Sequence, residues 1–166
     1  MKKNKDETEK AKKYAFRLLS QRPYTEKELQ DKLFKKGYTK IIVDTLQKGL
    51  KDLNFINDQE FALSYIETKL SEKPKGRYLL IQELQRKGIC REVIEQSLNK
   101  LLPKKKESFL AMRLAERKIK EIKSLKKVPT RQRIYLYLRS RGFGEEIIEE
   151  VIGKINYATT EQQQIK

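Results

Sequence analysis

Apolar residues recur along this chain at intervals of three and four, the spacing that places side chains on one face of an α-helix. The clearest instance is a glycine preceded by apolar residues at eight and four positions and followed directly by another apolar residue. The pattern occurs around Gly37, Gly88 and Gly142, so three copies in register indicate an internal repeat. The apolar positions are Leu29, Leu33 and Tyr38 in the first copy, Leu80, Leu84 and Ile89 in the second, and Ile134, Leu138 and Phe143 in the third.

The glycines predict how these three helices end. A glycine beyond the last helical turn can adopt the left-handed conformation that terminates a helix. In that ending the residue after the glycine packs back on the third residue from the helix end. We therefore predict contacts of Tyr38 with Leu33, of Ile89 with Leu84 and of Phe143 with Leu138. A proline precedes each helix: Pro23, Pro74 and Pro129.

Capping signals mark where some of the helices start. Thr25 with Glu28, and Asn57 with Glu60, match the capping box, in which a side-chain oxygen accepts from a free N–H and the carboxylate reaches back. Thr39 is placed to cap the helix that follows the first glycine. No stretch shows the apolar alternation of a strand.

A further amphipathic helix is predicted before and after each of the three glycine-terminated helices. The additional apolar residues expected on inward faces are Tyr14, Ala15, Leu18, Leu19, Ile42, Val43, Leu46 and Leu50; then Phe61, Ala62, Tyr65, Ile66, Leu70, Tyr78, Leu79, Ile81, Val93, Ile94, Leu98 and Leu101; then Phe109, Leu110, Leu114, Ile119, Ile122, Tyr135, Ile147, Ile148, Val151, Ile152 and Ile155.

These patterns predict an all-α fold, an elongated array of three tandem three-helix repeats. The repeats are expected at residues 11–56, 57–103 and 104–157, with a charged N-terminal tail at 1–10 and a polar C-terminal tail at 158–166. The first residues are either frayed or an extension of the first helix. Repeats of this size with thin apolar stripes cannot easily bury a core alone, so they are expected to stack.

The amino-acid composition excludes several kinds of site. The chain has no histidine and one cysteine, Cys90, which excludes an intrachain disulfide and the usual zinc sites, and removes the commonest general base. We expect Cys90 to be a small buried residue. No cofactor, metal or catalytic residue is expected. No stretch has the apolar length of a membrane span, and a cytoplasmic, monomeric protein is the expectation.

The charge of the chain points to a polyanionic partner. The net charge is +16, and residues 104–141 alone carry 14 basic and 3 acidic side chains, a net charge of +11. A field this positive favours nucleic acid or a strongly acidic protein surface.

Two groups of cations are candidates for that contact. Lys35, Lys36 and their counterparts precede the glycines, where they stabilise the negative helix end by ~0.3–1 kcal/mol, contact a partner, or do both. Arg113, Arg117 and Lys120 share one face of a predicted helix, for which, with Arg131 and Arg133, partner contact is favoured. The candidate binding residues are Arg77, Arg86, Lys87, Lys105, Arg113, Arg117, Lys118, Lys120, Arg131, Arg133, Arg139 and Arg141.

Arg77 and the tyrosines need separate interpretation. Arg77 follows Pro74 and Gly76 at a helix start, where a positive charge opposes the helix dipole, and this small cost favours a binding role. The tyrosines invite a base-stacking role, but most lie on apolar faces, which favours core packing. Tyr24 and Tyr137 are the exceptions.

The motifs together resemble the RecX family of bacterial recombination regulators. They are Thr25-x-x-Glu28-Leu29-x-x-Lys32-Leu33-x-x-Lys36-Gly37-Tyr38, Asn57-Asp58-x-x-Phe61-Ala62-x-x-Tyr65, Lys73-Pro74-x-Gly76 and Glu83-Leu84-x-x-Lys87-Gly88-Ile89. The resemblance extends from about Ala11 to Ile155. The third repeat departs most, with Arg141 in place of lysine and Ser140 interrupting the basic pair.

The resemblance implies a regulator that binds the RecA–DNA filament, in its helical groove and across neighbouring subunits. It implies modulation, mostly inhibition, of RecA recombinase and coprotease activity. Single-stranded DNA is expected as a weaker, largely electrostatic partner.

The alternative is a helical-repeat protein that binds DNA directly through its basic surface. Each second helix, glycine turn and third helix resembles a helix-turn-helix in outline. The acidic start Gly144-Glu145-Glu146 of the last helix argues against insertion into a duplex groove. An enzyme is the weakest interpretation, because a Gly-rich phosphate loop and a metal constellation are both missing.

Overall fold

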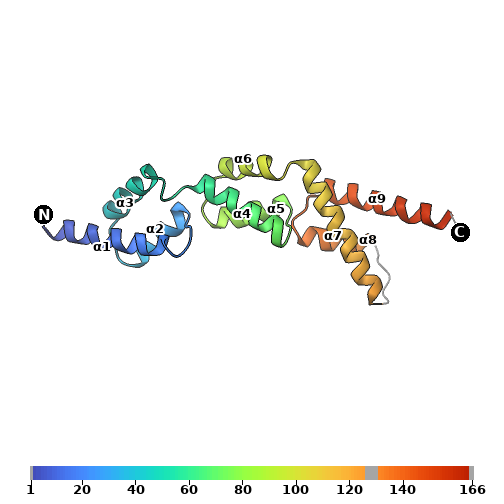
Figure 1. Cartoon of the computed structure of the whole chain (residues 1–166), viewed down its shortest axis with the longest axis horizontal. Helices are drawn as coiled ribbons and strands as arrows, with labels where there is room; N and C mark the ends of the chain where they lie inside the picture. Colours follow the sequence, from blue (N-terminus) through green and yellow to red (C-terminus); the bar gives the residue numbers. More distant parts are fainter. Residues whose placement is uncertain (1, 126–130, 165–166) are drawn as a thin grey trace. The chain divides into compact units, whose positions relative to one another are not determined.

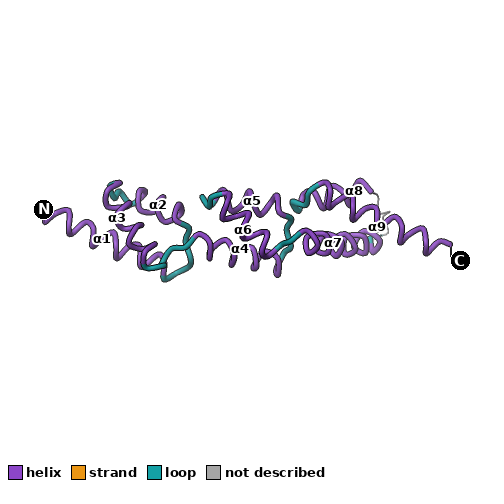
Figure 2. The backbone as a smooth tube through the Cα atoms, turned by 90° about the horizontal axis from the view of Figure 1, so that it is seen from above, coloured by secondary structure: helices purple, strands orange, loops and turns teal. Residues whose placement is uncertain are grey.

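The computed structural model describes residues 2–125 and 131–164, and the side chains of residues 6–125 and 131–155. Over these residues the secondary structure is entirely helical, as predicted, with no strand (Figures 1 and 2). The helices are α1 (Lys2–Leu19), α2 (Glu26–Lys35), α3 (Lys40–Asp52), α4 (Asp58–Glu72), α5 (Arg77–Arg86), α6 (Arg91–Leu101), α7 (Lys104–Ser124), α8 (Arg131–Ser140) and α9 (Glu145–Gln164).

The three repeat glycines end α2, α5 and α8 in the predicted way. Gly37, Gly88 and Gly142 have φ angles of +94°, +86° and +83°. The N–H of the residue after each glycine donates to a carbonyl in the last helical turn: Tyr38 to Leu33 (3.3 Å), Ile89 to Leu84 (3.2 Å) and Phe143 to Leu138 (3.3 Å). This is the Schellman ending, and it folds each apolar residue back towards the helix that it follows.

Two hydrophobic clusters surround the first and the third of these endings. The first joins α1, α2 and α3, and its fully buried members include Ala11, Ala15, Leu29, Leu33 and Val43. The second joins α7, α8 and α9 and includes Ala115, Leu138, Ile148, Val151 and Phe143. In both, the residue after the repeat glycine belongs to the same cluster as its predicted partner.

The chain divides into two compact units, Met1–Tyr65 with Glu83–Ser97, and Ile66–Gln82 with Leu98–Lys166. The division passes through the middle repeat, α4 to α6. The end of α5 therefore belongs with the first repeat, and the start of α5 belongs with the third.

Equivalent hydrogen bonds explain why α5 associates with the first repeat at its end and with the third repeat at its start. In the first unit the Thr25 hydroxyl donates to the Lys87 carbonyl over 2.6 Å. In the second unit the Gly76 N–H donates to the Arg141 carbonyl over 2.9 Å. Thr25 and Gly76 hold the same position in their repeats, as do Lys87 and Arg141. Each helix start is thus attached to the glycine turn of the next repeat.

A carboxylate from the next repeat completes each attachment. Asp58 accepts from the Glu26 N–H at the start of α2 (2.9 Å), and Glu107 accepts from the Arg77 N–H at the start of α5 (2.9 Å). These N–H groups have no partner within their own helix, so the carboxylates satisfy them. Burial raises the pKa of both Asp58 and Glu107, against the lowering effect of the hydrogen bonds.

The capping boxes form only in part. Thr25 accepts from the Glu28 N–H over 3.1 Å and Asn57 accepts from the Glu60 N–H over 3.1 Å, as predicted. The Glu28 and Glu60 side chains do not reach back to the helix starts as predicted, because Glu28 binds Arg22 and Lys87 and Glu60 accepts from the Asn54 side chain. Thr39 is the N-cap residue of α3, but its side chain makes no capping hydrogen bond.

Both ends of the described chain are helical. α1 begins at Lys2, so the first residues are an extension of the first helix, one of the two expected outcomes. The polar C-terminal tail expected at 158–166 is helical through Gln164. Pro129 lies outside the described residues.

Four side chains differ from the expected burial. Cys90 is exposed, because it precedes the first residue of α6 rather than lying under it. Tyr78 and Phe109, expected on inward faces, are 65% and 60% exposed. Tyr24, expected as an exception to core packing, is buried, with the Arg22 guanidinium 3.7 Å from its ring centroid.

Candidate partner and nucleic-acid interface

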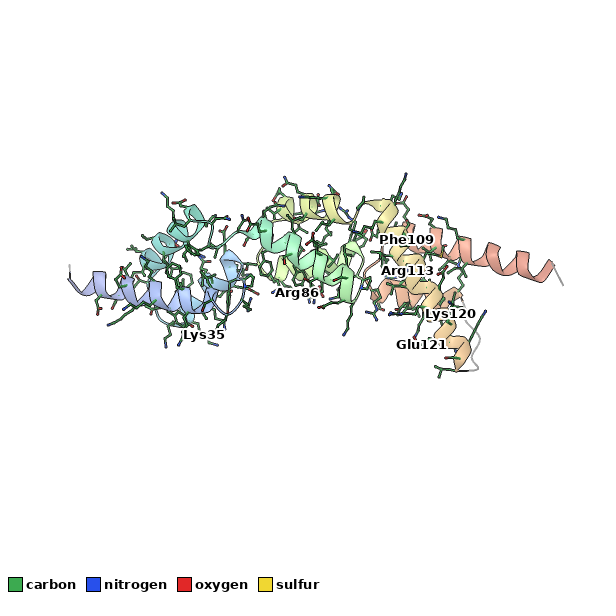
Figure 3. All side chains as sticks on the ribbon, in the orientation of Figure 1. Lys35, Arg86, Phe109, Arg113, Lys120 and Glu121 are labelled. Carbon is green, nitrogen blue, oxygen red and sulfur yellow. The ribbon has the colours of Figure 1, made fainter. Side chains whose placement is uncertain are left out.

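One face of α7 presents a row of exposed cations. Arg113, Arg117 and Lys120 are all exposed, and their spacing places them along one side of the helix. Figure 3 labels Arg113 and Lys120 on this helix, with Phe109 one turn before Arg113. We call Arg113, Arg117 and Lys120 the α7 basic face.

Burial of other residues on α7 fixes the direction of this face. Ala111, Leu114, Ala115 and Ile122 are buried against α8 and α9. These four residues define the inner side of α7, and Arg113, Arg117 and Lys120 lie on the opposite, exposed side. The sequence prediction of one shared face therefore agrees with the structure.

The positive charge of the α7 basic face is not balanced by nearby carboxylates of the described residues. Among the residues that the structure describes, Arg117 and Lys120 make no ion pair. The Arg113 guanidinium lies 5.8 Å from the centroid of the exposed Phe109 ring, an interaction that leaves its charge intact. Within the described part of the chain no carboxylate neutralises these three exposed charges, so they are available to an anionic partner.

The cations next to this face, Lys118 and Arg141, interact with other side chains of the protein. Lys118 forms an ion pair with Glu121 (2.7 Å), and its ammonium lies 5.4 Å from the Tyr137 ring centroid. The Arg141 guanidinium lies at the same distance from that ring. Tyr137, which sequence reasoning left as a base-stacking candidate, is half-buried and already in contact with two cations.

The three predicted binding residues of α8 differ in how available they are to a partner. Arg131 is paired with Glu149 of α9, which reduces the field that it presents to a partner. Arg133 is exposed. Arg139 is exposed, and its guanidinium lies 6.0 Å from the Tyr135 ring centroid and donates to the Tyr135 hydroxyl over 3.4 Å.

Arg77 has an internal function that the sequence did not reveal. Its guanidinium donates to the Leu102 carbonyl (3.2 Å) and to the Asn99 side chain (2.8 Å) at the end of α6. The buried Glu107 carboxylate on its N–H supplies the negative charge that a helix start favours. The unfavourable charge that suggested binding is therefore offset within the protein.

Lys87 is likewise committed to the attachment between repeats. It forms an ion pair with Glu28 (2.8 Å) and lies 5.2 Å from the Phe61 ring centroid. Partial burial acts to raise the pKa of Glu28, but hydrogen bonds from Lys87 and Arg22 outweigh it and hold that pKa below its ordinary value.

The other two predicted cations are accessible. Arg86 is exposed at the end of α5, next to Lys87. Lys105 is exposed in the first turn of α7, where its neighbour Lys104 forms an ion pair with Glu146.

Sequence reasoning missed an aromatic depression in the second unit. Tyr78 and Tyr135 line it together with Arg139, and its volume is about 510 Å³. A sequence signal for the exposure of Tyr78 existed. The positions equivalent to Tyr78 in the other repeats are Lys27 and Gln132, both polar, which marks an outward-facing position.

The described residues contain no cluster of three or more side chains placed to hold a metal ion. Searched over the same residues, the helices include none with the length and apolarity to cross a bilayer.

Together these features define a class: a protein built from three-helix repeats, with exposed cations most numerous on the first and third repeats. Family models agree. The first three-helix domain of RecX matches residues 11–46, and the second three-helix domain of RecX matches residues 57–98.

Individual relatives extend the match over most of the chain. The regulatory protein RecX of Caldanaerobacter subterraneus is 33% identical over 149 residues, which cover 88% of this chain and 71% of that protein. The regulatory protein RecX of Clostridium beijerinckii is 35% identical over 149 residues, covering 88% and 68%. The chain belongs to the RecX family, as its motifs predicted.

Solved structures share the fold. The crystal structure of RecX from Lactobacillus salivarius matches with a TM-score of 0.82 at 26% identity, covering 92% of this chain and 98% of that one. A second crystal structure of regulatory protein RecX matches with a TM-score of 0.76 at 26% identity, covering 88% and 71%. The three-helix repeats are therefore those of a RecX-type regulatory protein.

Proposed function

We propose that this chain is a non-catalytic regulator that binds the RecA–single-stranded-DNA filament, in its helical groove, and lowers RecA recombinase and coprotease activity. Membership of the RecX family supports the partner, through what the motif resemblance implies. The observation that carries the proposal is the α7 basic face, whose cations are exposed and form no ion pair with any side chain that the structure describes. Such a surface suits a filament that combines DNA phosphates with protein carboxylates.

The structure changes which residues to test. The sequence placed Arg131 with the α7 cations as a favoured contact, but Arg131 is already paired with Glu149. The better variant is Arg113→Glu with Arg117→Glu and Lys120→Glu. A matched control reverses Lys12, Lys13 and Lys48, which are exposed on α1 and α3 and change the net charge equally.

Binding should be measured by fluorescence anisotropy on nucleotide-stabilised RecA filaments at one moderate salt concentration. The α7 variant is expected to bind at least about tenfold more weakly, because it loses short-range contacts as well as net charge. The control is expected to lose much less. Equal losses in both variants would show that only net charge matters, and unchanged affinity in the α7 variant would rule out this face.

A second candidate function is direct binding of DNA without a role for RecA. The same exposed cations favour it, and so does the exposed tyrosine of the aromatic depression. Affinity for bare single-stranded DNA, for free RecA and for the filament, compared at one salt concentration, separates the two. Preference for the filament supports the regulator, and equal affinity for bare DNA supports the alternative.

A further inference from the structure

The aromatic depression lies within the second unit, where the start of α5 meets α8 and the start of α9. Tyr78 and Gln82 of α5, Tyr135 and Arg139 of α8, Ser140 and Glu145 contribute to its lining. Its volume of about 510 Å³ falls in the range of small-ligand sites. We propose that this depression binds an unstacked base of single-stranded DNA, with the base lying against Tyr78 and flanked by Tyr135 and Arg139.

The depression is formed by elements that the attachment between repeats holds in place. The Tyr78 N–H donates to the Gly142 carbonyl over 3.1 Å, and the Gly76 N–H donates to the Arg141 carbonyl over 2.9 Å. Two glycines permit the close approach. A Cβ on Gly142 would lie 2.3 Å from the Leu79 Cβ, and a Cβ on Gly144 would lie 2.9 Å from the Tyr78 ring. The backbone that carries the lining is thus held by contacts within the chain, and such preorganisation lowers the entropy cost of binding.

The lining chemistry matches a nucleobase. Tyr78 is 65% exposed, and exposure to water is unfavourable for the apolar surface of an aromatic side chain. Arg139 donates to the Tyr135 hydroxyl, so a guanidinium plane stands beside a second ring. Aromatic rings and guanidinium planes are the groups on which single-stranded bases stack. Gln82 and Ser140 can exchange hydrogen bonds with base edges.

The charged groups of the lining do not favour an anionic ligand over a neutral base. The Glu145 carboxylate lines the depression, and Glu146 follows it at the start of α9. The carboxylate of Glu145 offsets the charge of Arg139 in the same lining, so the depression has no net positive charge that would favour a phosphate or an acidic peptide over a neutral base. Glu145 can also accept from a base amino group. The strand phosphates would then lie outside the depression, on the side of the exposed Arg139.

This inference rests on the proposed function in one respect: it assumes that single-stranded DNA is part of the partner. The test uses two oligonucleotides of equal length, oligo-dT and a strand of the same phosphates that lacks its bases at internal positions. Affinities of the full chain for both strands are measured by anisotropy at one salt concentration. Because both strands carry the same charge, their affinity ratio reports the contribution of the bases.

The wild type is expected to bind oligo-dT about five- to a hundredfold more tightly than the abasic strand. Tyr78→Ala should reduce that ratio to near one without changing affinity for the abasic strand. Tyr78→Phe keeps the ring and should keep the ratio. Phe34→Ala, which removes another partly exposed ring in the first unit, should also leave it unchanged.

Several outcomes would overturn the proposal. Equal or undetectable binding of the two strands by the wild type would do so, and so would a normal ratio in Tyr78→Ala. If Tyr78→Ala instead weakened binding to DNA-free RecA with the base preference intact, the depression would be a protein-binding site. Failure here is distinguishable from failure of the proposed function, because filament binding by the α7 variant is measured separately.

Discussion

The Thr25 hydroxyl donates a hydrogen bond of 2.6 Å to the carbonyl of Lys87, which lies 62 positions further along the chain. The same oxygen accepts from the Glu28 N–H and so caps α2. One buried side chain therefore starts a helix and attaches it to the glycine turn of the next repeat. In the second unit the backbone of Gly76 makes the equivalent bond, to Arg141, without a side chain.

Thr25→Val is expected to lower the free energy of unfolding by about 1–3 kcal/mol. The variant keeps the shape of the side chain but loses the cap, and it leaves the partly buried Lys87 carbonyl without this donor. Thr25→Ser keeps both bonds and should cost much less. Urea unfolding followed by circular dichroism measures the difference. A loss as large in the serine variant would assign the effect to packing of the methyl group.

The three repeat glycines should differ in their tolerance of alanine. Each substitution carries the cost of a left-handed conformation, about 1–2 kcal/mol. Gly37→Ala should cost little more, because a Cβ there has no neighbour within 4 Å among the described atoms. Gly142→Ala should cost substantially more, because its Cβ would lie 2.6 Å from the backbone nitrogen of Leu79. Thermal unfolding of the two variants tests the order, and equal losses would contradict the contact.

Two carboxylates should give opposite pH dependences. The pKa of Glu28 is held below its ordinary value, so its contribution to stability is present above about pH 4.3 and is lost as the pH falls through the lower folded-state pKa. Burial raises the pKa of Glu107, so the folded state binds that proton more tightly and gains stability as the pH falls.

Glu28→Gln is therefore expected to weaken the loss of stability on acidification, and Glu107→Gln to strengthen it. Unfolding free energies measured between about pH 7 and pH 3 give the two slopes. The same direction of change in both variants would contradict the assignment. Each variant serves as the control for the other, because both remove one carboxylate.

Cys90 should react with a thiol reagent in the folded protein. It is exposed and it is the only cysteine of the chain, so one equivalent is expected to react without denaturant. Absorbance with a chromogenic disulfide reagent measures the stoichiometry. Cys90→Ser should abolish the signal and leave unfolding unchanged. Reaction only in denaturant would restore the buried position that the sequence suggested.

The helices and their ends were predictable because they depend on neighbours in the sequence. Leu29 and Leu33 lie on one face whatever surrounds them, and Gly37 ends α2 through bonds that span only one turn. The family followed from the same local motifs. The exposed row on α7 was also predictable, because a single helix sets the spacing of Arg113, Arg117 and Lys120.

The uses of individual charged and aromatic residues were not predictable in this way. Arg77 and Lys87 were candidates for binding, yet the structure gives them partners in Asn99 and Glu28, which are distant in sequence. Tyr78 was assigned to the core, yet it faces a depression that exists only because the start of α5 meets the turn after α8.

By itself, then, the sequence determined where helices start and stop, which faces are apolar, and that positive charge lies in the first and third repeats rather than in the middle one. Those properties follow from backbone conformations and hydrogen bonds within a few residues. Only the tertiary structure decided which cations remain available to a partner and which aromatic ring is uncovered. Solvent exposure and ion pairing depend on what other segments bring alongside, and local patterns do not encode that information.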